Sequence, residues 1–70
     1  MMDDATLERV VAEYADLSAK LDRLGRFILT DKFEDLPEVD RRDLREQRGH
    51  MLAYEAVLER RLERQVTPLD

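Results

Sequence analysis

Apolar residues recur at alternating steps of three and four in the first part of the chain, and this spacing restricts the fold more than any other feature. They are Leu7, Val10, Tyr14, Leu17, Leu21, Leu24 and Ile28. Such steps place all of them on one face of an α-helix, as in the seam of a coiled coil. The pattern predicts a helix over residues 4–29, with Asp3 or Asp4 capping its first turn. Val11 and Phe27 widen the apolar stripe, which indicates burial against more than one neighbour.

Residues 30–36 interrupt this pattern and predict a turn. Thr30 suits the cap of a short turn of helix, and Phe33 with Leu36 is expected to close the end of a hairpin. Pro37 disfavours the helical conformation for the residue before it and suits the first turn of a new helix. A second helix is therefore expected directly after the turn.

A second ladder of steps of three and four predicts this helix over residues 37–65. Its members are Leu44, Gln47, Met51, Tyr54, Leu58, Arg61 and Gln65, with Val39, Leu52, Val57 and Leu62 beside them. The apolar stripe drifts around the helix, as expected when one helix contacts both its hairpin partner and other subunits. Gly49 costs about 1 kcal/mol in a helix interior and marks either a close approach of another helix or a weak point. Pro68 cannot continue the helix, so residues 66–70 are predicted to form a frayed tail.

The predicted fold class is therefore all-α, an antiparallel two-helix hairpin with a short helical turn, in a single domain over residues 1–70. A chain of 70 residues buries a small share of its surface and usually needs disulfides, a metal or partner subunits. The chain has no cysteine and one histidine, His50, which leaves neither disulfides nor a zinc-ligand cluster. We therefore expect a compact homo-oligomer.

Charge and hydropathy argue against several classes of function. The net charge of −5 disfavours a binder of long nucleic acid, because a phosphate backbone rewards a cationic surplus. Regulation of transcription through the arginines between Arg41 and Arg48 is disfavoured by the acids interleaved with them. No apolar run approaches the roughly 20 residues needed to cross a bilayer, and Met1 to Asp4 is acidic where a signal peptide is basic. A cytoplasmic protein without a membrane partner is the expectation.

The usual signs of an active site are missing from the sequence. There is no nucleophile beside a base, no glycine-rich phosphate loop and no metal-ligand set. Acidic pairs such as Asp3 and Asp4 lie at expected helix starts, where carboxylates complement the helix dipole. His50 is interpreted as a surface or interface residue. We predict a binding protein with no catalytic residues, no metal and no cofactor.

Three residues are candidates for ligand contact, each with a structural alternative. Tyr14 is either a core residue whose hydroxyl reaches the bundle edge or a flat face for a nucleobase, worth roughly 1–3 kcal/mol per stacked base. Lys32 is either a solvated charge or a partner for a phosphate. Arg61, like Gln47, stands where leucine is expected, and buried polar groups in a helical seam usually set register or oligomeric state. Ligand contact is the alternative for Arg61.

The order of several short motifs resembles a known family. They are Glu13-Tyr14, Asp31-Lys32-Phe33, Gln47 and Tyr54-x-x-x-Leu58-x-x-Arg61, within a match over about residues 7–62. The family is the second type of anti-CBASS protein, from phages, whose members block cyclic-oligonucleotide-based antiphage signalling by sequestering the signal.

The resemblance implies a compact homohexamer in the cytoplasm of an infected bacterium, which binds cyclic dinucleotides between protomers and leaves them intact. In that family a tyrosine early in the first helix stacks on the nucleotide and a lysine near the turn meets its phosphate, which correspond here to Tyr14 and Lys32. Some members also hold cyclic trinucleotides in a separate site with an arginine from the later helix, for which Arg61 is the match. The alternative is a structural or adaptor hairpin that docks on a protein partner through its apolar stripe.

Overall fold

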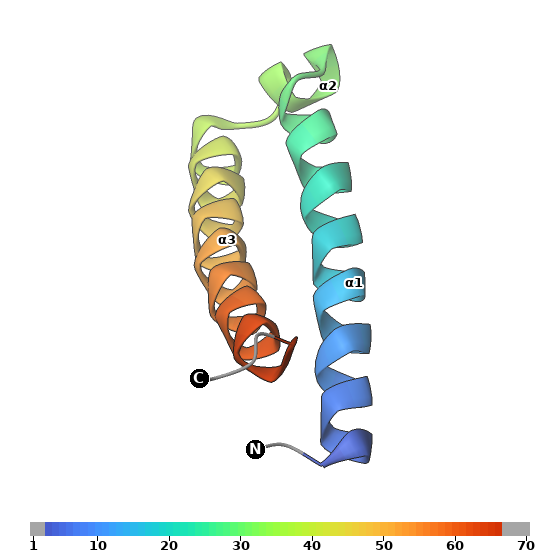
Figure 1. The fold of residues 1–70 in the computed structure, drawn as a ribbon. Coiled ribbons are helices and arrows are strands. Elements are labelled where there is room, and N and C mark those ends of the chain that lie inside the picture. Colours follow the sequence, from blue (N-terminus) through green and yellow to red (C-terminus); the bar gives the residue numbers. More distant parts are fainter. Residues whose placement is uncertain (1–2, 67–70) are drawn as a thin grey trace.

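The computed structural model describes residues 3–66, which form two long helices joined by a short one (Figure 1). Helix α1 spans Asp4–Ile28, α2 spans Asp31–Glu34 and α3 spans Glu38–Val66. The two long helices run antiparallel, so α1 begins at the end of the hairpin where α3 finishes (Figure 1). The predicted all-helical hairpin with a helical turn is confirmed.

The predicted helix boundaries differ from the observed ones by one residue. α1 ends at Ile28, and Leu29 is its C-cap. α3 begins at Glu38, after Pro37, and continues to Val66. Assigning Val66 to the tail was therefore wrong, because helical hydrogen bonding extends to this residue two positions before Pro68. The rest of the predicted tail, residues 67–70, lies outside the described residues.

Side-chain caps explain where the first two helices start. The carboxylate of Asp3 accepts the N–H of Thr6 at 2.7 Å, which satisfies one free donor of α1. This hydrogen bond lowers the pKa of Asp3, because it favours the charged carboxylate. The hydroxyl of Thr30 accepts the N–H of Phe33 at 3.3 Å and donates to the carbonyl of Phe27 at 2.6 Å. Thr30 therefore caps α2 and also ties it to the end of α1.

The hydrophobic core lies along the seam between α1 and α3. Its buried members are Val10, Leu17 and Leu21 from α1 and Leu58 from α3, with Tyr14, Met51 and Leu62 packed against them. All seven belong to the two predicted apolar stripes. The hydroxyl of Ser18 donates to the carboxylate of Glu55 at 2.6 Å and ties the helices together beside this core.

Phe33 closes the turn end of the hairpin, as predicted. Its side chain is fully buried, and the ring of Phe27 meets it edge-on with centroids 6.0 Å apart. The guanidinium of Arg45 lies 5.0 Å from the centroid of the same ring. Arg41 donates to the carbonyls of Glu34 and Leu36 at 2.7 and 2.8 Å. Both arginines therefore attach the turn to α3.

The hairpin is long and thin for its mass. Its radius of gyration is 15.8 Å, against about 11 Å for a compact domain of this length. The accessible surface is 5594 Å² for a chain of 8.3 kDa, where a monomeric protein of that mass exposes about 4,600 Å². The excess of roughly 1,000 Å² is surface that a compact fold would have buried.

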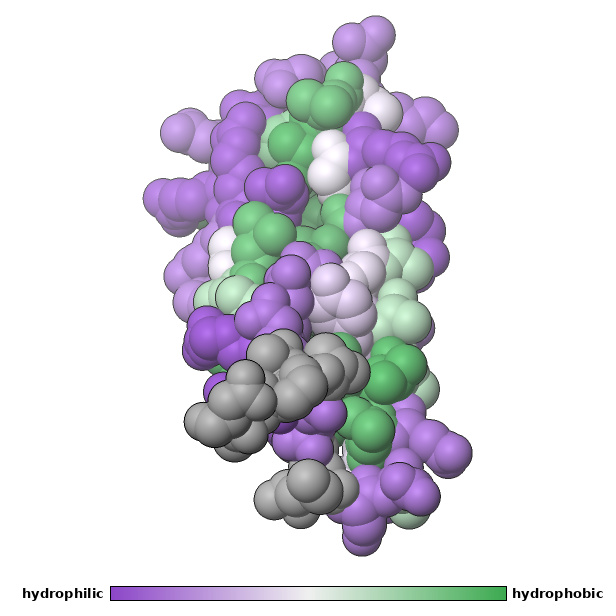
Figure 2. Space-filling model, viewed as in Figure 1, coloured by the Kyte–Doolittle hydropathy of each residue, from purple (hydrophilic) through white to green (hydrophobic). Residues whose placement is uncertain are grey.

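Part of this extra surface is an apolar stripe on the outside of α3. It consists of Gly49, Leu52, Ala53, Ala56 and Val57, all exposed. Their spacing places them on one helical face, and we call them the outer stripe of α3. A methyl group built at Gly49 meets no atom within 4 Å, so no helix in the described part of the protomer approaches closely there. Figure 2 shows hydrophobic patches among hydrophilic surface along both long helices.

The helices lack the character of membrane spans. Within residues 3–66, none is both long enough and apolar enough to cross a bilayer.

Candidate functional site

Tyr14 lies in the middle of α1 and packs against the core. Its side chain is half-buried and contacts the cluster that contains Leu17 and Leu58. Within one protomer, Tyr14 is therefore a residue that packs against the core. The side chain is not fully covered within the protomer, so part of it remains accessible to a ligand or to a second chain.

A polar contact joins the two helices next to Tyr14. The hydroxyl of Tyr54 donates a hydrogen bond to the carboxylate of Glu13. This bond raises the pKa of Tyr54, and desolvation and the negative charge of Glu13 act in the same direction. Arg61 opposes the shift through its positive charge, which places it near the pair.

Arg61 and Gln47, two polar residues of the second ladder, differ in burial. Arg61 is half-buried on α3. Gln47 is exposed, and its amide donates to the sulfur of Met51 at 3.7 Å on the same helix. Interpreting Gln47 as a polar group buried in the seam was therefore wrong for the protomer, because the seam does not cover that position.

Lys32 lies on α2, exposed at the turn end of the hairpin. Tyr14 is separated from the end of α1 at Ile28 by about 20 Å, at a rise of roughly 1.5 Å per residue. One protomer therefore does not bring Tyr14 and Lys32 together. Tyr14 and Arg61 share the other half of the hairpin, since Leu58, one turn before Arg61, packs in the cluster that Tyr14 contacts.

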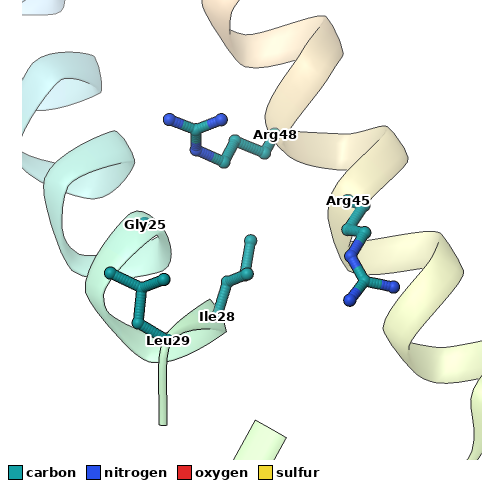
Figure 3. A pocket seen from close by; sticks show the side chains of 5 residues that line it. All are labelled: Gly25, Ile28, Leu29, Arg45 and Arg48. Atoms are coloured by element: carbon teal, nitrogen blue, oxygen red, sulfur yellow. The ribbon is translucent and has the colours of Figure 1, made fainter. Parts of the chain in front are cut away.

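A pocket of about 450 Å³ lies between the end of α1 and the first half of α3 (Figure 3). Its lining residues are Gly25, Ile28, Leu29, Arg45 and Arg48, so none of the three predicted ligand residues contributes to it. The sequence showed Arg45 and Arg48 only as members of a basic cluster. Their spacing of three residues indicates one helical face, but it does not reveal that this face meets Gly25.

Across residues 3–66, no three or more His, Cys, Asp or Glu side chains gather in an arrangement that could hold a metal ion.

Comparison with known proteins gives one match. A family model described as Sequestin matches residues 4–64, which include α1, α2 and all but the last two residues of α3. The matched span contains Tyr14, Lys32 and Arg61. No curated protein and no solved structure matches the chain.

Proposed function

The chain belongs to the Sequestin family, and on this premise we propose that it sequesters a small signalling molecule by binding it without converting it. The family match is the observation that carries the proposal, since it spans nearly all of the described hairpin. Sequestration depends on affinity and copy number rather than turnover. A few stacking and charged groups at a protein surface are enough for it.

The ligand that we propose is a cyclic oligonucleotide second messenger. Cyclic dinucleotides are the principal class and cyclic trinucleotides the second. The setting is an infected bacterium, in whose cytoplasm a phage protein of this kind would block CBASS signalling. The order of the Glu13-Tyr14 and Asp31-Lys32-Phe33 motifs supports this ligand class through the resemblance described above.

Tyr14 and Lys32 would act on one ligand from different protomers. Tyr14 offers an aromatic face for a base, and the exposed Lys32 offers a charge for a phosphate. The distance of about 20 Å between Tyr14 and the turn end of α1 requires a second chain to complete such a site. A symmetric assembly supplies each group more than once, which suits a ligand with repeated bases and phosphates.

The proposed assembly is a homohexamer, as the resemblance implies. The surface excess of roughly 1,000 Å² supports self-association, because a standard interface buries about 800 Å² on each partner. The outer stripe of α3 supports it as well, since its glycine and alanines allow close helix contact and all its residues are exposed in the described part of the protomer.

Calorimetry with a panel of cyclic di- and trinucleotides tests the proposal, followed by recovery of the ligand and chromatography. We expect tight binding and chemically unchanged ligand. No binding by a folded oligomer to any member of the panel would refute the ligand class. Recovery of a cleaved ligand would refute sequestration without turnover.

Variants of Tyr14 test its role without emptying the core. Tyr14→Leu keeps apolar volume but removes the aromatic face, and should weaken binding by the roughly 1–3 kcal/mol of a stacked base. Tyr14→Phe keeps the face and is the matched control. Equal affinity of the leucine and phenylalanine variants, both as folded oligomers, would exclude stacking on this residue.

The charged residues are tested in the same way. Lys32→Gln should weaken binding of every cyclic nucleotide, whereas Lys20→Gln is the control, since Lys20 is exposed and pairs with Asp16 at 3.1 Å. Arg61→Gln should weaken cyclic trinucleotides only. If the Lys20 and Lys32 variants lose affinity equally, general charge and not a specific contact is responsible.

The outer stripe of α3 favours one second candidate, an adaptor that docks on a protein partner. An exposed apolar stripe is typical of an interaction surface. The two functions differ in thermal stability, because a ligand that binds the native state raises its melting temperature. A rise with cyclic nucleotides supports sequestration, and no rise across the panel supports the adaptor.

A further inference from the structure

We propose that the pocket between α1 and α3 is a separate anion site, in which Arg48 binds the phosphate group of a small molecule and Arg45 adds a second positive charge. The proposal does not rest on the proposed function. The pocket includes neither Tyr14 nor Lys32, and its lining residues belong to one protomer.

Arg45 and Arg48 are both exposed, and their hydrogen-bond donors have no acceptor in the described part of the chain. Each guanidinium carries five N–H donors. Within residues 3–66, no carboxylate lies within ion-pair distance of Arg45 or Arg48, and neither donates a hydrogen bond to the protein. Their neighbour Arg41, in contrast, is used structurally, with both bonds to carbonyls of the turn. Apart from the contact of Arg45 with the ring of Phe33, the described fold does not use these two positive charges, so they are available to an anion.

Each guanidinium group lies beside an apolar or small residue. The guanidinium of Arg45 lies over the ring of Phe33, a cation–π contact that takes up no N–H donor of the arginine. Arg48 extends from α3 toward α1 (Figure 3), and its Nε lies 3.7 Å from the position of a methyl group at Gly25. The planar fork of donors matches the spacing of phosphate oxygens.

The rest of the pocket suits the organic part of a small phosphate ester. Its volume of about 450 Å³ lies within the range of roughly 300–1,000 Å³ for small-molecule sites. Ile28 faces the cavity from α1 (Figure 3), and Leu29 at its edge is 87% exposed. Figure 3 shows the guanidinium of Arg48 directed toward α1 and that of Arg45 directed another way, so charged groups lie at two places beside the apolar wall. An apolar wall with a few charged groups is the usual composition of such a site.

The negative end of the α1 dipole does not cancel this charge. A helix C-terminus corresponds to about half a negative elementary charge, whereas the two arginines contribute two positive charges. The surplus of positive charge favours an anion in the pocket. Because the pocket is open to solvent, the attraction between the arginines and the anion should weaken as salt is added.

The first test is calorimetry of the full chain at low ionic strength with adenosine monophosphate, inorganic pyrophosphate and inorganic phosphate. We expect saturable binding that Arg48→Gln weakens about tenfold or more, the loss of a charge-assisted contact. Arg60→Gln is the matched control, because Arg60 is an exposed arginine on α3 about 18 Å farther along the helix. Tighter binding of the nucleotide than of pyrophosphate assigns the site to phosphate esters, and the reverse assigns it to free phosphates.

Absence of binding to all three probes would overturn the proposal, as would equal losses in the Arg48 and Arg60 variants. Circular dichroism confirms that each variant is helical. A second readout is the amide resonance of Gly25, which should shift on titration in wild-type protein and not in Arg48→Gln. Tyr14→Leu should bind pyrophosphate normally, so failure of cyclic nucleotide binding and failure of this site are distinguishable.

Discussion

Leu58→Ala should remove a large part of the stability of the hairpin. Leu58 is fully buried and is the buried α3 member of the core cluster, whose buried α1 members are Val10, Leu17 and Leu21. Truncating a buried leucine to alanine costs about 2–5 kcal/mol, the transfer term plus the cavity left behind. A domain of this size has roughly 4–10 kcal/mol of total stability. The variant should therefore be partly unfolded, or close to it, at room temperature.

Urea denaturation followed by circular dichroism measures this loss. At a slope of about 1 kcal/mol per molar urea, typical of small proteins, the midpoint should fall by 2 M or more. Protomer concentration must be equal in all samples, because association contributes to apparent stability. Val39→Ala is the control, since Val39 is 53% exposed in the first turn of α3 and should change stability by about 0.5 kcal/mol or less. Equal losses in the two variants would refute the position of the core.

Three further predictions concern single residues outside the core. Gly49→Ala should raise the stability of the protomer by about 1 kcal/mol in urea denaturation, because the new methyl group meets no atom within 4 Å. If the variant instead loses assembly in size-exclusion chromatography, another chain packs against Gly49. Asp3→Ala should lower the melting temperature at neutral pH, because the charged Asp3 caps α1. The pKa of Asp3 is below its ordinary 3.8, so the difference in melting temperature between variant and wild type should vanish as the pH falls through the lowered pKa. The pKa of Tyr54 is raised above 10.0, so its hydrogen bond to Glu13 stabilises the fold below pH 10.0. This stabilisation is lost as the pH rises through the raised pKa. The melting temperatures of wild type and Tyr54→Phe should therefore converge at high pH. A difference in melting temperature that persists at low pH would refute the role of Asp3, and one that persists at high pH would refute that of Tyr54.

Local signals predicted the helices because a helix depends mainly on residues close in sequence. Thr30 and Asp3 cap helices through hydrogen bonds to residues three positions away, and Pro37 restricts only its neighbours. The first apolar ladder correctly predicted the α1 side of the core. Helix boundaries were accurate to one residue for the same reason.

The second ladder was less informative, since spacing tells which residues share a helical face and not which part of that face is covered. Leu58 is buried, whereas Gln47 is exposed and Tyr54 is 43% exposed on the same ladder. Which positions of α3 are buried depends on where α1 packs along this helix. The burial of each ladder position could therefore be known only from the packed hairpin.

The sequence by itself determined the helical class, the turn and the residues able to stack on a base or pair with a phosphate. Only the tertiary structure decided that Tyr14 and Lys32 lie at different places along the hairpin, and that Arg48 approaches Gly25 at a pocket that Arg45 also lines. The physical reason is that helix formation is governed by contacts three and four residues apart. The pairing of Arg48 with Gly25 depends instead on the register of two helices, which the whole core and the turn set together.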